Sequence, residues 1–232
     1  MLKALPKLIM FDLDGTLADT VNELHEAVIY ALKSLNLPLI DISKTRRYVG
    51  NGADLLVARS ITQDETITMD KVDLSLQKRA RALFNEFYKE HLDCSKSLYP
   101  NVIETLELIH SLGIKSAVVT NKPNSFVKPL LKVSGLEELF DFSLGSEVIP
   151  YKKPRPEPLL YVCKNLGIES NEAVMVGDSN NDIEAAHNAN IVSIGLTYGY
   201  NRGKPISDSK PDYVFSEFKQ IGDLLRSLIK QK

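Results

Sequence analysis

Two carboxylates one residue apart end the first apolar run of the chain. Residues 7–16 read KLIMFDLDGT, so Asp12 and Asp14 follow an apolar segment and precede Gly15. Residues two apart in a strand point to the same side, and a glycine just beyond lets the backbone turn sharply. Like charges this close require a cation or a shared proton between them. The pattern therefore predicts a metal site or proton-transfer chemistry, although an ordinary strand and turn is the alternative.

A hydroxyl and an amide, those of Thr120 and Asn121, stand at the end of a second strand-like segment. In a parallel α/β sheet, ligands bind beyond the carboxyl ends of the strands, so these side chains are expected near Asp12. Both can donate hydrogen bonds to an anion without adding negative charge. The alternative is a plain strand-to-helix turn in which Asn124 caps the next helix.

Two further carboxylates follow a later strand-like segment, in residues 177–182, which read GDSNND. Asp178 could reach the same crevice as Asp12 and supply a third oxygen donor for a hard cation such as Mg²⁺. Asp182 lies about one helical turn later and could orient a neighbouring group. Ser179 and Asp182 could also cap a helix, and one segment can do both.

A lysine in a stiff loop completes the candidate set. Lys153 lies within residues 151–158, YKKPRPEP, where each proline fixes its own φ and restricts the residue before it. A lysine held in this way is positioned, although a solvated surface loop is the commoner setting for a lysine. Four candidate positions now occur in order, each near a predicted strand end, and together they indicate a reactive site.

Short β-rich apolar segments alternate with helical stretches, which is the pattern of an α/β parallel sheet. Three of the helices are followed by glycines suited to a left-handed C-terminal position, namely Gly113, Gly135 and Gly167. The predicted strands cover residues 7–12, 115–120, 140–144, 173–177, 191–195 and 212–215. The helices predicted between them cover residues 102–112, 125–134 and 157–166.

One interval breaks this alternation. From about residue 17 to residue 96 no strand-like segment intervenes, and helical patterns cover residues 22–35, 54–60 and 71–91. A stretch this long with several helices favours a small domain over a simple crossover connection. We therefore expect an α/β core domain made of residues 1–16 and 97–232, with a helical domain of residues 17–96 inserted after the first strand.

Composition excludes several classes of protein. A hydrophobic fraction of 44% and a charged fraction of 25% are typical of a soluble globular chain. A net charge of -2 leaves no basic excess for binding nucleic acid. No run approaches the roughly 20 apolar residues that span a bilayer, and no secretory signal is evident, so we expect no membrane partner and a cytoplasmic location. Cys94 and Cys163 lie far apart without metal-ligand spacing, so neither a disulfide nor zinc is expected.

In these motifs the chain resembles phosphatases of the haloacid dehalogenase superfamily. Those proteins carry Asp-x-Asp-Gly-Thr, then a Thr or Ser, then a Lys, then Gly-Asp-x-x-x-Asp, and residues 12–16, Thr120, Lys153 and 177–182 fall on these motifs. The resemblance covers nearly the whole chain. It implies a Rossmann-like three-layer core with a parallel sheet, and it makes residues 17–96 an α-helical cap domain.

The resemblance also implies catalytic and metal-binding roles. Asp12 would be the nucleophile that forms an aspartyl phosphate. Asp14 would protonate the leaving alkoxide and then deprotonate the attacking water. Mg²⁺ would be the cofactor, held by the Asp12 carboxylate, the main-chain carbonyl of Asp14 and Asp178.

Phosphate binding is implied for a second set of residues. Thr120, Asn121 and Lys153 would hold the phosphate oxygens as charge shifts during transfer, which makes Lys153 part of the catalytic set. Asp182 would steady Lys153 or the water shell of the metal.

The cap is expected to close over the substrate and to reopen for water. Its hinges would be residues 17–20 and 92–99. Gly50 and Asn51 would bring backbone amides close to a small anionic substrate, and Arg46 or Arg47 would be available to pair with a carboxylate. The alternative for this loop is a tight turn between helices, with the arginines merely solvated.

Within the superfamily, residues 49–53, 118–123 and 152–159 most resemble the bacterial phosphatases that act on 2-phosphoglycolate. The expected reaction is therefore Mg²⁺-dependent hydrolysis of 2-phosphoglycolate to glycolate and phosphate. Asn180 stands where arginine is often found in such relatives, which removes a positive charge near the site.

Three alternatives stay open. The substrate could be another small phosphate or pyrophosphate, or the protein could resemble β-phosphoglucomutase and return the phosphate to a sugar instead of to water. A binding module with a dead site is the third, and the intact acids count against it. The small phosphate is the one partner predicted, and the sequence leaves open whether the protein is a monomer or a homodimer.

Overall fold

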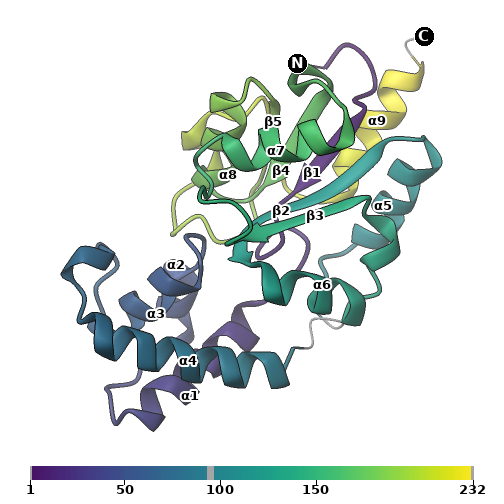
Figure 1. Ribbon diagram of the computed structural model, residues 1–232. Helices are drawn as coiled ribbons and strands as arrows, with labels where there is room; N and C mark the ends of the chain where they lie inside the picture. The colour runs from purple at the N-terminus through teal and green to yellow at the C-terminus, as the bar shows by residue number, and fades with distance from the viewer. Residues whose placement is uncertain (1, 93–96, 231–232) are drawn as a thin grey trace.

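The computed structural model describes residues 2–92 and 97–230, and within them the strands form one parallel sheet (Figure 1). The strands are β1 (Leu8–Phe11), β2 (Lys115–Pro123), β3 (Phe142–Ser146), β4 (Ala173–Gly177), β5 (Val192–Leu196) and β6 (Tyr213–Phe215). Their order across the 6-stranded sheet is β3-β2-β1-β4-β5-β6. The prediction of an α/β fold with a parallel sheet is confirmed.

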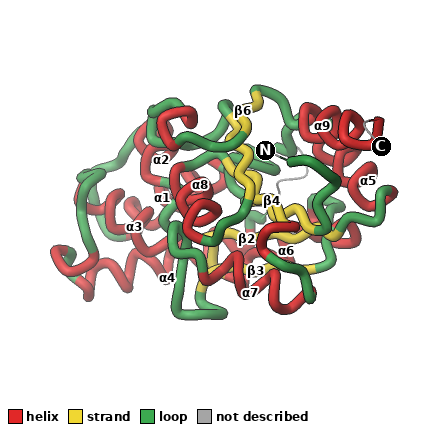
Figure 2. The backbone as a smooth tube through the Cα atoms, turned by 90° about the horizontal axis from the view of Figure 1, so that it is seen from above, coloured by secondary structure: helices red, strands yellow, loops and turns green. Residues whose placement is uncertain are grey.

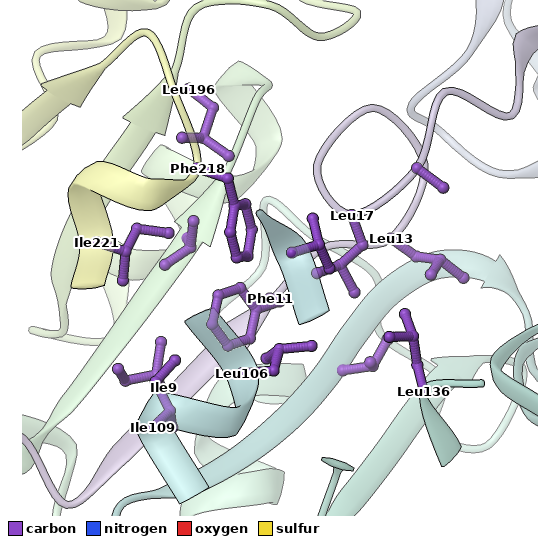
Figure 3. Packing of buried hydrophobic residues seen from close by; sticks show 14 of the residues in the cluster. Ile9, Phe11, Leu13, Leu17, Leu106, Ile109, Leu136, Leu196, Phe218 and Ile221 are labelled. Carbon is purple, nitrogen blue, oxygen red and sulfur yellow. The ribbon is translucent and has the colours of Figure 1, made fainter. Parts of the chain in front are cut away.

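Helices cover both faces of the sheet. Alternate strand residues point to opposite sides, so each face carries apolar side chains that a helix layer buries. Ile9 and Phe11 of β1 belong to a core shared with α5 (Val102–Ser111), α6 (Asn124–Val133) and α9 (Lys219–Lys230), part of which Figure 3 shows. Leu8 and Met10 face the opposite core, shared with α7 (Glu157–Leu166) and α8 (Asn180–Asn188). The expected three-layer arrangement is present.

A helical region lies between β1 and β2 along the chain. Its described helices are α1 (Val21–Ser34), α2 (Ile42–Tyr48), α3 (Ala53–Thr62) and α4 (Leu74–Glu90). Figures 1 and 2 both show them gathered on the side of the molecule away from α5 and α9. They have their own apolar core, which Phe126 of α6 and Tyr200 join from the sheet side. The helices therefore pack against the rest of the chain at these two aromatic residues.

The two segments that connect this helical region to the sheet lie side by side. Ala18 in the first segment forms an antiparallel bridge with Leu98 in the second. The predicted hinges, residues 17–20 and 92–99, include this pair. Residues 93–96, and with them Cys94, lie outside the described residues, so the hinge role stays a prediction.

The glycines predicted to end helices do so. Gly113, Gly135 and Gly167 have φ angles of 69°, 71° and 66°, in the left-handed region that suits glycine. Short 3₁₀ turns lie at Met69–Lys71, Glu137–Leu139, Ser170–Glu172 and Ile206–Ser209. No helix within the described residues is both long and apolar enough to cross a membrane.

Some element boundaries differ from the predicted ones. The strand predicted to end at Thr120 continues to Pro123, because a register shift lets it pair again with Ser146 of β3. Three helices, α2, α8 and α9, have no predicted range, although Ser179 and Asp182 were named as possible caps of a helix where α8 begins. For α9 a signal existed, since Ile221, Leu225 and Leu228 recur at helical spacing and are buried, whereas α2 has only 7 residues, too few for a clear period.

Candidate active site

The carboxyl ends of β1, β2 and β4 meet at one edge of the sheet. Phe11, the last residue of β1, is level with Val118 of β2 and with Val176 of β4. The residues that follow these positions therefore leave the sheet side by side. From β1 the sheet extends through β2 and β3 on one side and through β4, β5 and β6 on the other. α/β folds bind their ligands at such a point, where the strand order changes direction.

Lys153 is a buried cation between two carboxylates. Its Nζ lies 3.1 Å from Asp12 Oδ1 and 2.6 Å from Asp182 Oδ1, and it donates to the carbonyl of Val119 at 2.6 Å. Burial alone lowers the pKa of a lysine, but the two carboxylates outweigh burial here and raise the pKa of Lys153. Lys153 therefore keeps its charge beside Asp12.

Asp182 is held by the first turn of α8. Its Oδ2 accepts hydrogen bonds from the main-chain nitrogen of Ser179 at 3.0 Å and from the Ser179 hydroxyl at 2.7 Å. The contact with the Ser179 main-chain nitrogen, together with that of the Asp182 main-chain nitrogen to the Ser179 side chain, forms a capping box, and Oδ1 of Asp182 contacts Lys153. The sequence suggested two roles for Asp182, as a helix cap and as an orienting group. Its carboxylate makes the contacts of both, with Ser179 and with Lys153.

Asp14 faces a second buried lysine, Lys122. The Nζ of Lys122 lies 2.8 Å from Asp14 Oδ1 and 3.1 Å from Oδ2, and the Thr20 hydroxyl donates to Oδ1 at 2.6 Å. The ammonium also lies 4.7 Å from the centre of the Tyr88 ring. Burial lowers the pKa of Lys122, but Asp14 and Tyr88 more than offset it, so the pKa is raised. The sequence prediction assigns Lys122 no role, although its place directly after Thr120 and Asn121 was a signal.

Asp178 is fixed by a hydroxyl and a main-chain amide. Its Oδ1 accepts from the Thr16 hydroxyl at 2.6 Å, and its Oδ2 accepts from the nitrogen of Tyr200 at 2.6 Å. Burial and the neighbouring carboxylates raise the pKa of Asp178 well above its usual value. Gly15, at φ +85°, passes so close that a Cβ there would lie 2.5 Å from Asp178 Oδ2. Only glycine fits this approach without displacing the carboxylate.

The acidic residues match the donor set of a hard divalent cation. Asp12, Asp178 and Asp182 offer oxygen atoms within 4.8 Å of one another. Burial raises the pKa of Asp12 to about 7 even though Lys153 opposes the shift, so a cation here would relieve a concentration of buried negative charge. Asp182 is already paired with the Lys153 ammonium at 2.6 Å, whereas the contacts of Asp178 are with the uncharged Thr16 hydroxyl and Tyr200 amide, which makes Asp12 and Asp178 the better ligands. An all-oxygen set of this kind fits Mg²⁺.

A cavity opens between these strand ends and helices α1, α3 and α4. Its empty volume is about 460 Å³, part of it open to solvent. Its charged and hydroxyl-bearing side chains include Asp12, Asp14, Thr120 and Lys122. The rest of the wall is largely apolar or glycine: Leu24, Val49, Gly50, Gly52, Ala53, Leu56, Phe84, Tyr88, Asn121, Pro123 and Phe126.

Asn121 connects the loop between α2 and α3 to the sheet. Its Oδ1 accepts from the nitrogen of Lys153 at 2.9 Å, and its Nδ2 donates to the carbonyls of Lys153 at 2.9 Å and Gly50 at 3.0 Å. The Gly50 carbonyl also accepts from Asn181 Nδ2 at 3.0 Å. In this structure the Asn121 amide therefore fastens Lys153 and the Gly50 loop, while its contact to phosphate stays a prediction.

The two arginines suggested for a substrate carboxylate lie elsewhere. Arg46 pairs with Asp19 at 3.2 Å, and Arg47 pairs with Glu65 at 3.2 Å. Both arginines line a different cavity, beside Tyr200. The structure does not bring them to the cavity that holds Asp12.

Asn51 and Asn180 are also not part of the lining of that cavity. The Oδ1 of Asn51 accepts from Arg59 Nη2 at 3.1 Å, and the Oδ1 of Asn180 accepts from the Ser209 hydroxyl at 2.9 Å. Both asparagines line a neighbouring cavity at the N-terminal end of α8. Of the predicted loop pair, Gly50 alone reaches the Asp12 cavity.

The fold and this cluster of acids agree with a family assignment. The sequence matches the haloacid dehalogenase-like hydrolase family over residues 9–196, which is more than half of the chain. The protein belongs to this family. Its class is thus that of a hydrolase with an α/β core.

Three individual proteins are similar to this chain over most of its length. A phosphoglycolate phosphatase of Vibrio parahaemolyticus is 44% identical over 215 residues, covering 93% of this chain and 94% of that protein. One from Haemophilus influenzae is 43% identical over 219 residues, covering 94% and 98% respectively. The crystal structure of a predicted phosphoglycolate phosphatase from Haemophilus somnus has a TM-score of 0.85 and 41% identity, covering 97% of this chain and 99% of that one.

Proposed function

We propose that the protein hydrolyses 2-phosphoglycolate to glycolate and phosphate, with Mg²⁺ and through an aspartyl phosphate on Asp12. The observation that carries this proposal is the convergence of Asp12, Asp14, Lys153 and Asp178 at the strand ends: Asp12 and Asp14 line a small cavity, and Lys153 and Asp178 lie beside Asp12. Relatives at 42–44% identity that are named phosphoglycolate phosphatases support the choice of substrate.

Asp12 and Asp178, together with the main-chain carbonyl of Asp14, are the proposed ligands of Mg²⁺. When bound, the ion supplies positive charge between the nucleophilic carboxylate and the phosphate and so reduces their repulsion. Thr16 and the Tyr200 amide hold the Asp178 carboxylate in place for this task.

The first half-reaction transfers the phosphoryl group to the protein. A carboxylate oxygen of Asp12 attacks phosphorus, and the bond between phosphorus and the leaving oxygen breaks. Asp14 donates its proton to that oxygen, so the alcohol departs neutral at this atom. Lys153 and Thr120 bind the phosphate oxygens, and Lys153 is held beside Asp12 for this role by Asp182.

The second half-reaction restores Asp12. Asp14, now a carboxylate, takes a proton from water, and the water oxygen attacks phosphorus. The bond between phosphorus and Asp12 breaks, and inorganic phosphate leaves. Asp14 is thus acid in one step and base in the next, which requires that it face the leaving oxygen and the water at the same position.

The helical region is the proposed cap. In this proposal, residues 17–96 form a cap domain on a core of residues 1–16 and 97–232, and they close over the substrate. The hydrogen bonds from Asn121 and Asn181 to the Gly50 carbonyl hold the cap loop against the core, which supports such closure. Gly50, which lines the Asp12 cavity, is the proposed substrate contact from this loop, and Asn51, which lines the neighbouring cavity, would reach the substrate only after the loop moves.

A panel of small phosphates assayed with Mg²⁺ tests the proposed function. The panel contains 2-phosphoglycolate, pyrophosphate, glycerol phosphate and sugar phosphates, and 2-phosphoglycolate is expected to have the highest or nearly the highest kcat/KM. A poor rank for 2-phosphoglycolate contradicts the substrate assignment. Conversion of a hexose 1-phosphate to its 6-phosphate isomer contradicts the assignment as a hydrolase.

A further inference from the structure

We infer that Lys122 binds a negative charge on the leaving group, so that the site selects phosphate esters with a carboxylate close to the ester oxygen. The inference rests on the proposed function in one respect: that function places the leaving oxygen beside Asp14. It adds a specificity-determining residue from the core. The sequence had suggested Arg46 or Arg47 of the helical region for this role.

Distance is the first argument. Lys122 Nζ lies 2.8 Å and 3.1 Å from the two oxygens of Asp14. A proton donor acts within hydrogen-bond reach of the oxygen that it protonates. The Lys122 ammonium therefore lies within about two hydrogen-bond lengths, roughly 6 Å, of the leaving oxygen. In 2-phosphoglycolate a single methylene separates that oxygen from the carboxylate, so the carboxylate can reach the ammonium.

Charge balance is the second argument. Asp14 must be protonated to act as an acid, and it then no longer neutralises Lys122. The Lys122 side chain is only 3% exposed, and an unpaired charge at such a depth is costly. Lys153 already faces Asp12 and Asp182, so those carboxylates are engaged elsewhere. A carboxylate on the substrate replaces the lost counter-charge at the moment when Asp14 is neutral.

The wall of the cavity is the third argument. Lys122 is the only basic side chain among the described residues that line it, and the side toward the helices is apolar, with Leu24, Leu56 and Phe84. An anionic leaving group thus has one cationic partner there. Glu23 of α1 also acts electrostatically on Lys122, but burial raises the pKa of Glu23, and its side chain is not part of the cavity wall.

The test is a ratio of kcat/KM values, 2-phosphoglycolate over ethyl phosphate, which has the same ester linkage without the carboxylate. Lys122→Met and Lys122→Gln are expected to lower this ratio by about 10- to 100-fold, the range for one hydrogen bond to a charged group. Both substrates are measured on the same preparation, so a lower folded fraction cancels from the ratio.

A binding measurement covers variants with too little turnover. 3-Phosphonopropionate and propylphosphonate differ in the same way as the two substrates, and neither is hydrolysed. Calorimetry with Mg²⁺ is expected to show that wild type prefers 3-phosphonopropionate and that Lys122→Met loses this preference. Equal preference in wild type and variant overturns the inference.

Lys152→Met is the matched control. Lys152 lies near the same cavity, but its side chain is 37% exposed and lies 3.9 Å from Asp54, so the ratio is expected to change by less than about threefold. A ratio that falls in Lys152→Met and survives in Lys122→Met overturns the inference. Equal losses on both substrates in the Lys122 variants also overturn it, because Lys122 then acts only through Asp14. A wild-type enzyme without preference for 2-phosphoglycolate contradicts the proposed function itself.

Discussion

Asp182 places the ammonium of Lys153 against the proposed nucleophile. One oxygen of Asp182 lies 2.6 Å from Lys153 Nζ, while the other caps the first turn of α8 through Ser179. The same ammonium lies 3.1 Å from Asp12. A single buried carboxylate therefore couples the start of a helix to the charge in the candidate site.

Asp182→Ala is expected to destabilise the fold strongly, because it leaves the buried Lys153 ammonium without one of its two carboxylates. The expected loss in the free energy of unfolding is about 3–5 kcal/mol, as for other broken buried ion pairs. Ser179→Ala removes only the cap hydroxyl and is expected to cost about 1 kcal/mol. Urea denaturation measures both. Equal losses in the two variants would mean that Asp182 serves only as a helix cap.

Asp12→Asn is expected to lower kcat by at least about 10⁴-fold, because an amide oxygen is a poor nucleophile. Folding is expected to persist, because the amide is isosteric with the carboxylate and its oxygen can still accept from Lys153, which also keeps its closer contact with Asp182. The comparison uses steady-state rates and thermal unfolding, with the exposed Asp223→Asn as a control that keeps wild-type values. Substantial activity in Asp12→Asn refutes the nucleophile assignment.

Mg²⁺ affinity is expected to rise with pH until the pKa of Asp12 is passed. Burial raises that pKa to about 7 in the protein without metal, so below this pH the carboxyl must lose a proton before it can bind the ion. Because the pKa of Asp178, the other proposed carboxylate ligand, is raised as well, calorimetry in buffers of different ionisation enthalpy is expected to show more proton release at about pH 6 than at about pH 8. An affinity that does not change with pH means that Asp12 is already ionised or is not a ligand.

Asn181→Ala is expected to weaken closure of the helical region without touching Asp12. It removes one of the two side-chain hydrogen bonds to the Gly50 carbonyl. The loss of one neutral hydrogen bond predicts a rise in KM of about 2- to 10-fold, with faster amide exchange in residues 49–53. Asn121→Ala is expected to lower kcat as well, because Asn121 also binds the main chain of Lys153. Identical effects of the two variants would argue against this division of roles.

The acidic residues at the strand ends could be predicted from the sequence, because the pattern that marks each of them spans only a few neighbouring residues. Asp12 and Asp178 each follow an unbroken apolar run, and the parallel sheet then brings the ends of β1 and β4 together. The capping box of Ser179 and Asp182 is likewise contained in four successive residues. The fold class and the convergence of these acids could therefore be predicted.

The partner of Asp14 could not be predicted in this way. Lys122 is separated from Asp14 by 108 positions in the chain, and its contact with Tyr88 depends on where the tertiary fold places α4 relative to the end of β2. The positions of the two arginines could not be predicted for the same reason. Arg46 contacts Asp19 because of the way α2 packs in the tertiary fold. Pairings of this kind depend on tertiary packing, which hydrophobic periodicity does not specify.

Chemical trapping on Asp12 tests the central claim most directly. The enzyme is quenched with acid during turnover of 2-phosphoglycolate and treated with tritiated borohydride, which reduces an aspartyl phosphate to homoserine. Peptide mapping is expected to find tritium at position 12, and none in samples quenched without substrate. Tritium at another position, or turnover without any tritium incorporation, contradicts the claim that Asp12 carries the phosphoryl group.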